Sequence, residues 1–581
     1  MSGPPGASPG WSGSGRAATF GIGAGLAALA SLSFSPGVLK GDLVNPDTAM
    51  RLLRLKSSLA AGAPLHAVMR DSSGYGTVLH WSHLLDALIL AVAAPVAAVG
   101  GWDAGLRWVI VVFGPLTVGL LALAVAWAVL PVASAGYGRL GPVWMAALVL
   151  GLTHSVVQYG LSGVIHHHVL LAATAAMTVG YAIRSVETGG GRAGAYLGLW
   201  AAIGLWLSPE ALAFGLMAYG GVWVAWLTQP TAAIGRAIAA AGCALFGFTL
   251  LAWAVDPPAA GYMAIEPDRI SIMFVWLGAG AAFAGSFALL RSWARPIALV
   301  AATGSAVLWL VAYPQILHGT AGLMAPEQAA AFFGGILEMS PVDGPASAIL
   351  HLGSGVLAVA FLAWVAWYRR SVIILYVTIC AVVMVALGAR HFRFGTYPAT
   401  LAAGLLPVAI AMVMRSALPD QTVALVRIAM ITAVLALPAL AGNGLAALMP
   451  GGRRELAGQN SATCTLEGAA ALAGPLGDAI VLAPVNDGPF LLWRTSIRTV
   501  GTLYHRGIEG YMRLDRAWLD PADPYAAVVA TKATYVLLCP QPGLSAPPGS
   551  LLARLAVNDV PPWLKLDGAS GGYVLYRVVT P

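Results

Sequence analysis

Long apolar runs determine how this chain can fold. The sequence contains repeated stretches of about 17 to 25 residues that are apolar and almost free of charge, each long enough to cross a bilayer as a helix. Hydrophobic residues make up 59% of the 581 residues and charged residues only 9%, whereas about a quarter of a soluble domain is charged. The sequence therefore predicts a multi-pass membrane protein with a mainly α-helical fold.

These runs predict about thirteen membrane-spanning helices. The run 83–100 is also apolar enough to span, but it would then move every later Arg-bearing loop to the opposite side of the membrane. We therefore interpret it as re-entrant or interfacial. The predicted spans are 19–39, 106–130, 141–160, 167–184, 194–208, 209–227, 237–254, 270–290, 295–313, 346–367, 371–388, 397–414 and 428–449.

Short Arg-bearing loops predict the orientation. The connections YGRLG, RSWAR and YRRS fall on one side of the membrane in this register, and the positive-inside rule makes that side cytoplasmic. The N-terminus is then cytoplasmic, and everything after about residue 450 lies outside. The net charge of +7 follows from the same loop bias. Because no basic stripe is interleaved with aromatic residues, we expect no nucleic-acid partner.

Composition divides the chain into three parts. Residues 1–18 are rich in Gly, Ser and Pro and predict a disordered tail, and residues 19–449 form the transmembrane domain with a first outer loop at 40–105. In residues 450–581 the runs AIVLAPV, TYVLLC and GYVLYRVV predict strands, and PYAAVVATKA predicts a helix. This last part is a small α/β domain, in which Cys464 and Cys539 are able to pair in an oxidising compartment.

Carboxylates and imidazoles collect on the predicted outer side. Because these groups converge from several loops on one membrane face, the collection predicts a site for a metal or a cationic group. The alternative is that outer loops are simply hydrated and carry acids. The candidate residues are the acids Asp42, Asp47, Asp71, Glu210, Asp256, Glu266, Asp268, Glu327, Glu338 and Asp343, and the histidines at 166–168 in SGVIHHHVLL.

The first outer loop, GDLVNPDTAMRLLRL, places Asp42 and Asp47 before an Arg-bearing amphipathic stretch. It resembles the first loop of the GT-C superfamily of membrane glycosyltransferases, which take a sugar from a polyprenyl phosphate or pyrophosphate carrier. The segment VLHWSHLLDALIL looks like the return to the membrane in the oligosaccharyltransferase-like branch. The resemblance implies an inverting enzyme of the bacterial inner membrane with a periplasmic C-terminal domain. It also implies that Asp47 is the catalytic carboxylate, with Asp42 as the second candidate.

The histidine run is similar to an acidic-His pattern that contributes to the metal site of that branch, with His166 at the family's Asp position. The resemblance implies a divalent cofactor, Mn²⁺ or Mg²⁺, bound by Asp47, His166, His167 and Glu338. Glu338, in GGILEMSP, is a weak match to a glutamate of a loop motif in the same branch. Imidazole in place of carboxylate suits Mg²⁺ poorly, because hard cations prefer oxygen. Alternatively, the histidines cap or hydrogen-bond at a helix entry.

Three further segments extend the resemblance. ARHFRFGTYPA supplies cationic groups where the family places an arginine on the lipid-linked phosphate, a role that suits the guanidinium fork. WLSPEALAF is similar to an acidic position of bacterial relatives, and GPFLLWRTSIRTVGTLYHRGIEGY resembles a Tyr-His-Arg pattern of GT-C-type proteins. The alternative for the cationic groups is snorkelling toward lipid headgroups. The implied substrate-binding residues are Arg390, His391, Arg393, Glu210, Tyr504, His505 and Arg506.

We therefore expect a transferase that moves a sugar or oligosaccharide from a polyprenyl-linked donor to an acceptor at the outer face of the membrane. Its partners are that donor and membrane lipids. The sequence lacks the Trp-Trp-Asp motif of N-glycosylating enzymes, so the acceptor stays open among glycan, lipid and protein. The alternatives are a transporter of lipid-linked saccharides and a catalytically inactive GT-C scaffold. A transporter would place ionisable groups near the midplane and show internal repeats, and the sequence has no convincing repeat.

Overall fold

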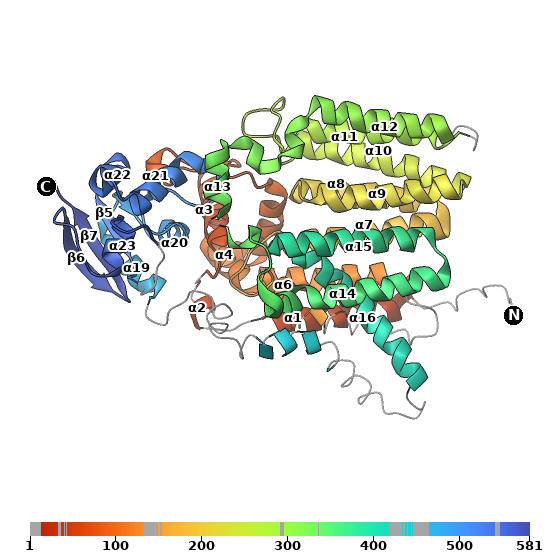
Figure 1. Cartoon of the computed structure of the whole chain (residues 1–581), viewed down its shortest axis with the longest axis horizontal. Helices are drawn as coiled ribbons and strands as arrows, with labels where there is room; N and C mark the ends of the chain where they lie inside the picture. The colour runs from red at the N-terminus through yellow and green to blue at the C-terminus, as the bar shows by residue number, and fades with distance from the viewer. Residues whose placement is uncertain are drawn as a thin grey trace. The chain divides into compact units, whose positions relative to one another are not determined.

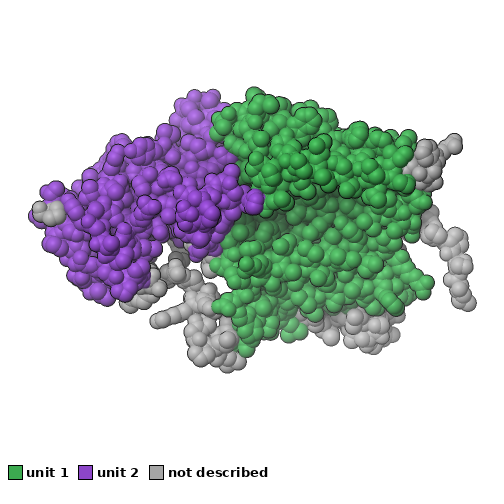
Figure 2. Space-filling model, turned by 45° about the horizontal axis from the view of Figure 1, so that its top comes forward, with its two compact units in different colours: residues 1–41, 87–317, 337–450 green, residues 42–86, 318–336, 451–581 purple. Residues whose placement is uncertain are grey.

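The structure, a computed structural model, forms two compact units (Figure 2). Unit 1 contains residues 1–41, 87–317 and 337–450, and unit 2 contains residues 42–86, 318–336 and 451–581. The structure describes residues 13–32, 36–39, 41, 43–132, 146, 149–150, 154–290, 295–334, 336–417, 433, 436–438, 440–442, 444–445, 464–540 and 546–580.

Unit 1 is a helical bundle (Figure 1). Within the described residues, seven helices are long and apolar enough to cross a membrane. They agree with the predicted runs, whereas half of the expected span 141–160 and most of the expected span 428–449 lie outside the described residues. The helices of unit 1 are α1 (Gly13–Ser31), α2 (Pro36–Leu39), α4 (His83–Val129), α6 (His154–Val157), α7 (His168–Arg184), α8 (Gly191–Leu207), α9 (Ala211–Thr228), α10 (Ala232–Val255), α11 (Ile272–Phe287), α12 (Arg295–Ala312), α14 (Gly344–Arg369), α15 (Val372–Arg390) and α16 (Thr396–Ala417).

Helix α4 is broken in the middle. Gly101 has φ +78° and ψ 168°, which an L-residue with a side chain rarely adopts. Beyond the break the chain folds back, because Gly105 lies close to Ala93 and Ala97. Residues 83–100 therefore form a separate arm that packs on the arm predicted to span at 106–130. The re-entrant or interfacial placement of this first arm stays a prediction.

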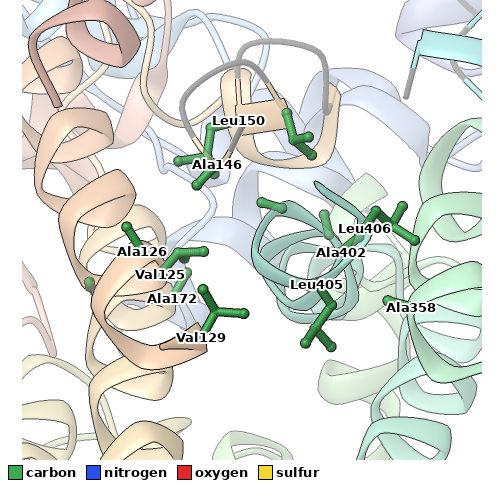
Figure 3. Close-up of a cluster of buried hydrophobic side chains, with 14 of the residues drawn as sticks. Val125, Ala126, Val129, Ala146, Leu150, Ala172, Ala358, Ala402, Leu405 and Leu406 are labelled. Atoms are coloured by element: carbon green, nitrogen blue, oxygen red, sulfur yellow. The ribbon is translucent and has the colours of Figure 1, made fainter. Parts of the chain in front are cut away.

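Small residues let the helices approach closely. On α8, Gly194 and Gly198 contact the backbone of α10 at Ala237 and Ala241, and a β-carbon at either glycine would clash there. This Gly-x-x-x-Gly spacing is typical of membrane helix pairs, in which backbone proximity replaces the hydrophobic effect as the driving force. A buried apolar cluster joins α4, α7, α14 and α16 (Figure 3). Its members include Val125, Ala172, Ala358, Ala402 and Leu405.

Unit 2 contains a five-stranded mixed sheet with the strand order β4-β3-β5-β7-β6. The three predicted strands and the predicted helix are confirmed as β3 (Ile480–Leu482), β5 (Tyr535–Leu538), β7 (Tyr573–Val578) and α22 (Pro524–Ala530). Cys464 and Cys539 form a disulfide. The remaining elements of this part are α19 (Leu466–Ala473), α20 (Gly488–Arg494), β4 (Arg498–Thr499), α21 (Ile508–Leu519), α23 (Leu551–Ala556) and β6 (Leu564–Ser570).

Residues 42–86, from the segment predicted as the first outer loop, fold together with the C-terminal residues in unit 2. They contain α3 (Pro46–Ala61) and a hairpin of β1 (Ala67–Val68) and β2 (Thr77–Val78). The guanidinium of Arg70 donates to the carbonyls of Leu492, Thr495 and Ile497, which lie at or just beyond the C-terminal end of α20. A cation is favourable at that end of a helix. These bonds are made over more than 400 residues of sequence, which is why a boundary drawn by composition at residue 450 does not show them.

A buried carboxylate holds the same hairpin in place. Asp71 is fully buried and accepts hydrogen bonds from the hydroxyls of Thr77, Thr499 and Thr502. Burial raises the pKa of Asp71, and the hydroxyl donors partly offset this. A buried polar group costs free energy unless it is hydrogen-bonded, so these donors stabilise the hairpin. A third segment, α13 (Pro326–Gly334), joins unit 2 where the hydroxyl of Tyr511 donates to the carbonyl of Ala331.

We expect Asp487 to make unit 2 less stable as the pH rises from about 4 to 6. Burial raises its pKa to about 6, against about 3.9 in an unfolded chain, and a hydrogen bond from Tyr573 offsets only part of this. In that window the unfolded state releases a proton that the folded state retains, so the free energy of unfolding falls by about 3 kcal/mol. Asp487→Asn should flatten the dependence of the thermal midpoint on pH, whereas Asp478→Asn, at an exposed ion pair, should leave it unchanged. Equal slopes in wild type and Asp487→Asn would contradict this.

Candidate functional site

Asp47 is fixed at the start of α3 in unit 2. Asn45 is the N-cap residue, and its side-chain oxygen accepts from the backbone N–H of Asp47 at 2.7 Å. Pro46 supplies the backbone angle that a first helical position requires. A carboxylate in the first turn is stabilised by the positive end of the helix dipole. The local sequence Asn-Pro-Asp thus explains the placement of the predicted catalytic carboxylate.

Tyr504 donates its hydroxyl to Asp47 Oδ1 at 2.7 Å. Burial and the negative charge of Asp47 hold the pKa of Tyr504 well above its ordinary value, so the phenol stays protonated and remains a donor. His505 is buried, and its ring lies 4.5 Å from the ring of His80. Arg506 is half-buried in the same turn, and Asp42, the second candidate carboxylate, lies outside the described residues.

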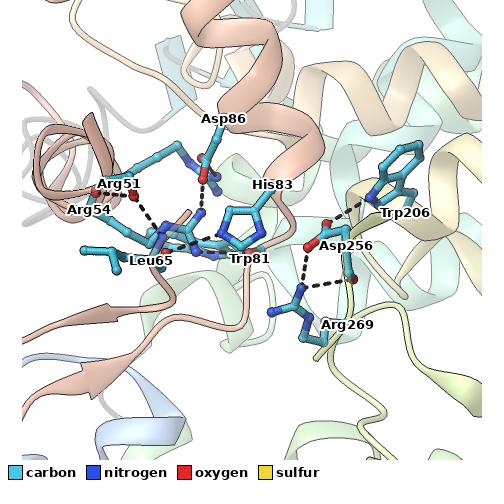
Figure 4. Close-up of polar contacts among 10 residues, drawn as sticks. Arg51, Arg54, Leu65, Trp81, His83, Asp86, Trp206, Asp256 and Arg269 are labelled. Carbon is cyan, nitrogen blue, oxygen red and sulfur yellow. Dashed lines mark hydrogen bonds and ion pairs between the residues drawn. The ribbon is translucent and has the colours of Figure 1, made fainter. Parts of the chain in front are cut away.

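Two buried arginines follow Asp47 on the same face of α3. Arg51 and Arg54 both pair with Asp86 in the first turn of α4, Arg51 at 3.0 Å (Figure 4). Arg54 also donates to the carbonyl of Trp81, and the Arg51 guanidinium lies 4.3 Å from the centre of the Trp81 ring. Burial lowers the pKa of Arg51, while Asp86 and Asp47 raise it. The Asp86 carboxylate is therefore paired with two guanidiniums. The charge of Asp47 makes a smaller favourable contribution at Arg51.

In unit 1, Glu210 and Arg393 form a partly buried ion pair. Arg393 Nη2 lies 2.7 Å from Glu210 Oε2, and the hydroxyl of Tyr397 donates to Glu210 Oε1 at 3.0 Å. Burial lowers the pKa of Arg393, but Glu210 and Glu338 more than offset this and hold it above its ordinary value. The Nε of Arg393 is buried without a hydrogen-bond partner. The guanidinium is thus permanently charged and has a donor to spare.

Glu338 lies in a turn at Leu337–Met339, within electrostatic reach of Arg393. The turn is held against the end of α15, because His391 Nδ1 donates to the carbonyl of Met339 at 2.8 Å. The predicted substrate-binding residues Arg393 and Glu210 are thus brought together with Glu338. His391 supports the turn, and Arg390 is exposed at the last position of α15.

Three adjacent histidines are buried at the start of α7. The ring centres of His166, His167 and His168 lie 4.4 to 4.6 Å apart, and a possible ligand atom of each lies within 4.8 Å of the others. Both ring nitrogens of His168 are buried without a hydrogen-bond partner, although buried imidazoles are usually bonded. Tyr159 stacks on His168 at 4.7 Å. Three adjacent imidazoles, one of them with unpartnered ring nitrogens, fit a transition metal better than Mg²⁺.

Asp256 of unit 1 is engaged in a structural contact. Asp256 pairs with Arg269 at 2.6 Å and accepts from Trp206 Nε1 at 2.9 Å (Figure 4). Both members of the ion pair are buried, so the contact closes the 256–271 segment against α8. The sequence interpretation counted Asp256 among the acids of a cation site, and here its carboxylate serves a protein cation instead.

The structure adds functional candidates that the motifs did not reveal. Tyr397 lies in the segment ARHFRFGTYPA, where the sequence gives no reason to separate it from other aromatic residues of a helix. Its hydrogen bond to Glu210 identifies it as a candidate. Asp86 stands in an apolar run, where its charge alone is a signal of a buried partner. Its partners Arg51 and Arg54 have the i, i+3 spacing of one helix face, which the sequence does show.

No family model and no curated protein matches the chain. The helical part and the α/β part together share the fold of a solved archaeal oligosaccharyltransferase, which agrees with the fold class predicted from the sequence. The oligosaccharyltransferase AglB from Archaeoglobus fulgidus, in complex with an inhibitory peptide and a dolichol-phosphate, has a TM-score of 0.66 at 12% identity. That alignment covers 90% of this chain and 69% of that chain.

Other structures of the same archaeal enzyme agree. Its complex with Zn and sulfate has a TM-score of 0.61 at 12% identity, over 90% of this chain and 67% of that one. The form tethered to an acceptor peptide containing the NVT sequon has a TM-score of 0.63 at 12% identity, over 90% and 69% of the two chains. Likeness at this identity establishes a shared fold.

Proposed function

We propose that this protein is a GT-C glycosyltransferase that takes a sugar or oligosaccharide from a polyprenyl phosphate or pyrophosphate donor. The observation that carries the proposal is a polar cluster beside an apolar cavity in unit 1. The cavity has a volume of about 150 Å³ and is lined by side chains that include Val129, Ala175 and Met384. Tyr397 lines this cavity and also donates to Glu210, the partner of Arg393. A phosphate head with an isoprenoid tail has this same division into an anionic and an apolar part.

Three of the predicted residues have separate roles in this proposal. Arg393 would hold the departing phosphate, because its guanidinium keeps its charge and has an unpartnered Nε. Asp47 would be the catalytic carboxylate that acts on the acceptor nucleophile or orients it. Glu210 orients Arg393 through their ion pair. His505 and Arg506 are proposed to contact the acceptor or the donor. The proposal also includes inversion of configuration at the anomeric carbon.

The test is a transfer assay on the full-length protein in detergent. Polyprenyl-linked sugars with mono- and pyrophosphate carriers are compared with nucleotide sugars, and both transferred and hydrolysed sugar are measured. We expect release or transfer from polyprenyl-linked donors alone. No release with any donor, together with movement of labelled lipid-linked saccharide across proteoliposomes, would instead support the transporter alternative.

We expect Arg393→Lys to lower kcat/KM for the donor about 10- to 100-fold. Lysine keeps the charge but loses the fork that binds phosphate and carboxylate in two places. The measurement is donor-dependent kinetics, and Arg554→Lys, at an exposed ion pair with Asp559, should leave both constants unchanged. Unchanged donor kinetics in Arg393→Lys would place the phosphate elsewhere.

We also propose a divalent cation at His166 and His167, supported by His168. Glu210 and Glu338 carry two negative charges and Arg393 one positive charge, so the cluster has one net negative charge before a phosphate binds. A divalent cation would offset this charge and that of the phosphate. When bound, the metal would supply electrophilic stabilisation of phosphate oxygens.

After chelation we expect the protein to bind Zn²⁺ or Mn²⁺ more tightly than Mg²⁺, because the donors are imidazoles. Calorimetry on wild type and His167→Ala measures this, with the exposed His318→Ala as control. Equal binding by the two variants would show that the histidines have a structural role.

A further inference from the structure

We infer that Tyr504 is a positioning residue that holds the carboxylate of Asp47 in one orientation. Tyr504 belongs to the C-terminal part of the chain, and Asp47 belongs to the first outer loop, 457 residues away. Both residues lie in unit 2. The C-terminal part thereby takes part in the reaction without touching the substrate. This inference rests on the catalytic role proposed for Asp47.

Packing fixes the Tyr504 ring before the hydroxyl is considered. The ring is 5% exposed and belongs to an apolar cluster with Met50 and Leu53 of α3 and Leu492 of α20. The ring centres of Trp81 and Tyr504 lie 5.3 Å apart, with the two planes perpendicular. This edge-to-face contact is favourable beyond the area that it buries. The ring therefore has little freedom, and its hydroxyl is presented to Asp47 in a defined direction.

The hydroxyl of Tyr504 can donate one hydrogen bond, and it donates that bond to Asp47. At 2.7 Å the contact has the length of a good O–H···O bond to an ionised acceptor. A phenol that donates to Asp47 cannot donate to a sugar or a phosphate at the same time. The sequence interpretation gave Tyr504 a direct substrate contact, and its hydrogen bond assigns it a role through Asp47 instead.

Other charged groups lie around the bond. Arg51 and Asp71 also act on Tyr504 electrostatically, and Arg51 is paired with Asp86. Loss of the phenol hydroxyl therefore frees the Asp47 side chain among other charged groups, whereas the apolar contacts of the ring are kept.

The test compares Tyr504→Phe with a matched control in the full-length protein. Tyr573→Phe removes a phenol that also donates to a carboxylate of unit 2, Asp487, at 3.0 Å. We expect Tyr504→Phe to lower kcat about 10- to 100-fold with little change in donor KM, since a hydrogen bond to a charged group is lost. Tyr573→Phe should leave both kcat and donor KM unchanged.

Outcomes that concern Tyr504 are separable from those that concern the proposed function. If Asp47→Asn is inactive while Tyr504→Phe matches wild type in kcat and donor KM, the positioning role is overturned and the function stands. If the wild type turns over no donor, thermal unfolding still tests the contact. Tyr504→Phe should then lower the midpoint in the wild-type background and less in an Asp47→Ala background. Additive shifts in that cycle overturn the inference.

Discussion

Asp47→Asn should lower kcat for sugar transfer about 10²- to 10⁴-fold, the range expected when a positioned acid or base is lost. The substitution keeps the shape of the side chain, and an amide oxygen still accepts from Tyr504. The backbone contact with Asn45 does not involve the changed atoms. We therefore expect the variant to fold normally, with an unfolding midpoint close to that of wild type. The measurement is kcat with a saturating polyprenyl-linked donor, together with thermal unfolding of the same preparation.

The matched control is Asp478→Asn. Asp478 is an exposed carboxylate of the same unit and pairs with Arg498, so its loss changes the charge by the same amount. We expect its kinetics to equal those of wild type. Full activity of Asp47→Asn would move the catalytic role to another carboxylate, with Asp42 next in line. A large fall in the unfolding midpoint would show that Asp47 serves the fold.

The transmembrane helices were predictable because a bilayer imposes a length on each apolar run. The length of the run at residues 83–100 did not decide its placement, which we interpreted from the Arg-bearing loops instead. The reversal of the chain at Gly101 was not predicted. The strands β3, β5 and β7 were predictable because each is a short apolar run between turn residues. The strands β4 and β6 were not, because Arg498–Thr499 and Leu564–Ser570 carry polar residues.

The site was predictable as a set of residue types and unpredictable as a set of contacts. Asp47, Arg393 and Glu210 stand in short motifs, so the sequence alone draws attention to them. The bond between Tyr504 and Asp47 joins residues 457 positions apart, and no local pattern encodes such a distance. The same holds for Arg70, whose carbonyl partners lie more than 400 residues away.

Asp86→Asn should destabilise unit 2 by about 3 to 5 kcal/mol, because it leaves two buried guanidiniums without their counter-charge. Arg51 and Arg54 are 2% and 0% exposed, and each also has a buried Nε without a hydrogen-bond partner. Water therefore cannot replace the lost carboxylate. For a unit of this size the loss corresponds to a fall in the unfolding midpoint of about 10 °C. Thermal unfolding of the full-length protein, followed at the unit 2 transition, measures it.

Two controls decide whether buried charge is the cause. Asp567→Asn removes a carboxylate from an exposed ion pair with Arg577 and should barely move the midpoint, since exposed pairs contribute little. Asp86→Leu combined with Arg51→Met and Arg54→Met removes all three charges while keeping apolar volume beside Trp81. Buried ion clusters replaced in this way are often as stable as before, so the triple variant should recover most of the loss. A triple variant as unstable as Asp86→Asn would show that the three side chains stabilise the unit by shape and hydrogen bonding rather than by balanced charge.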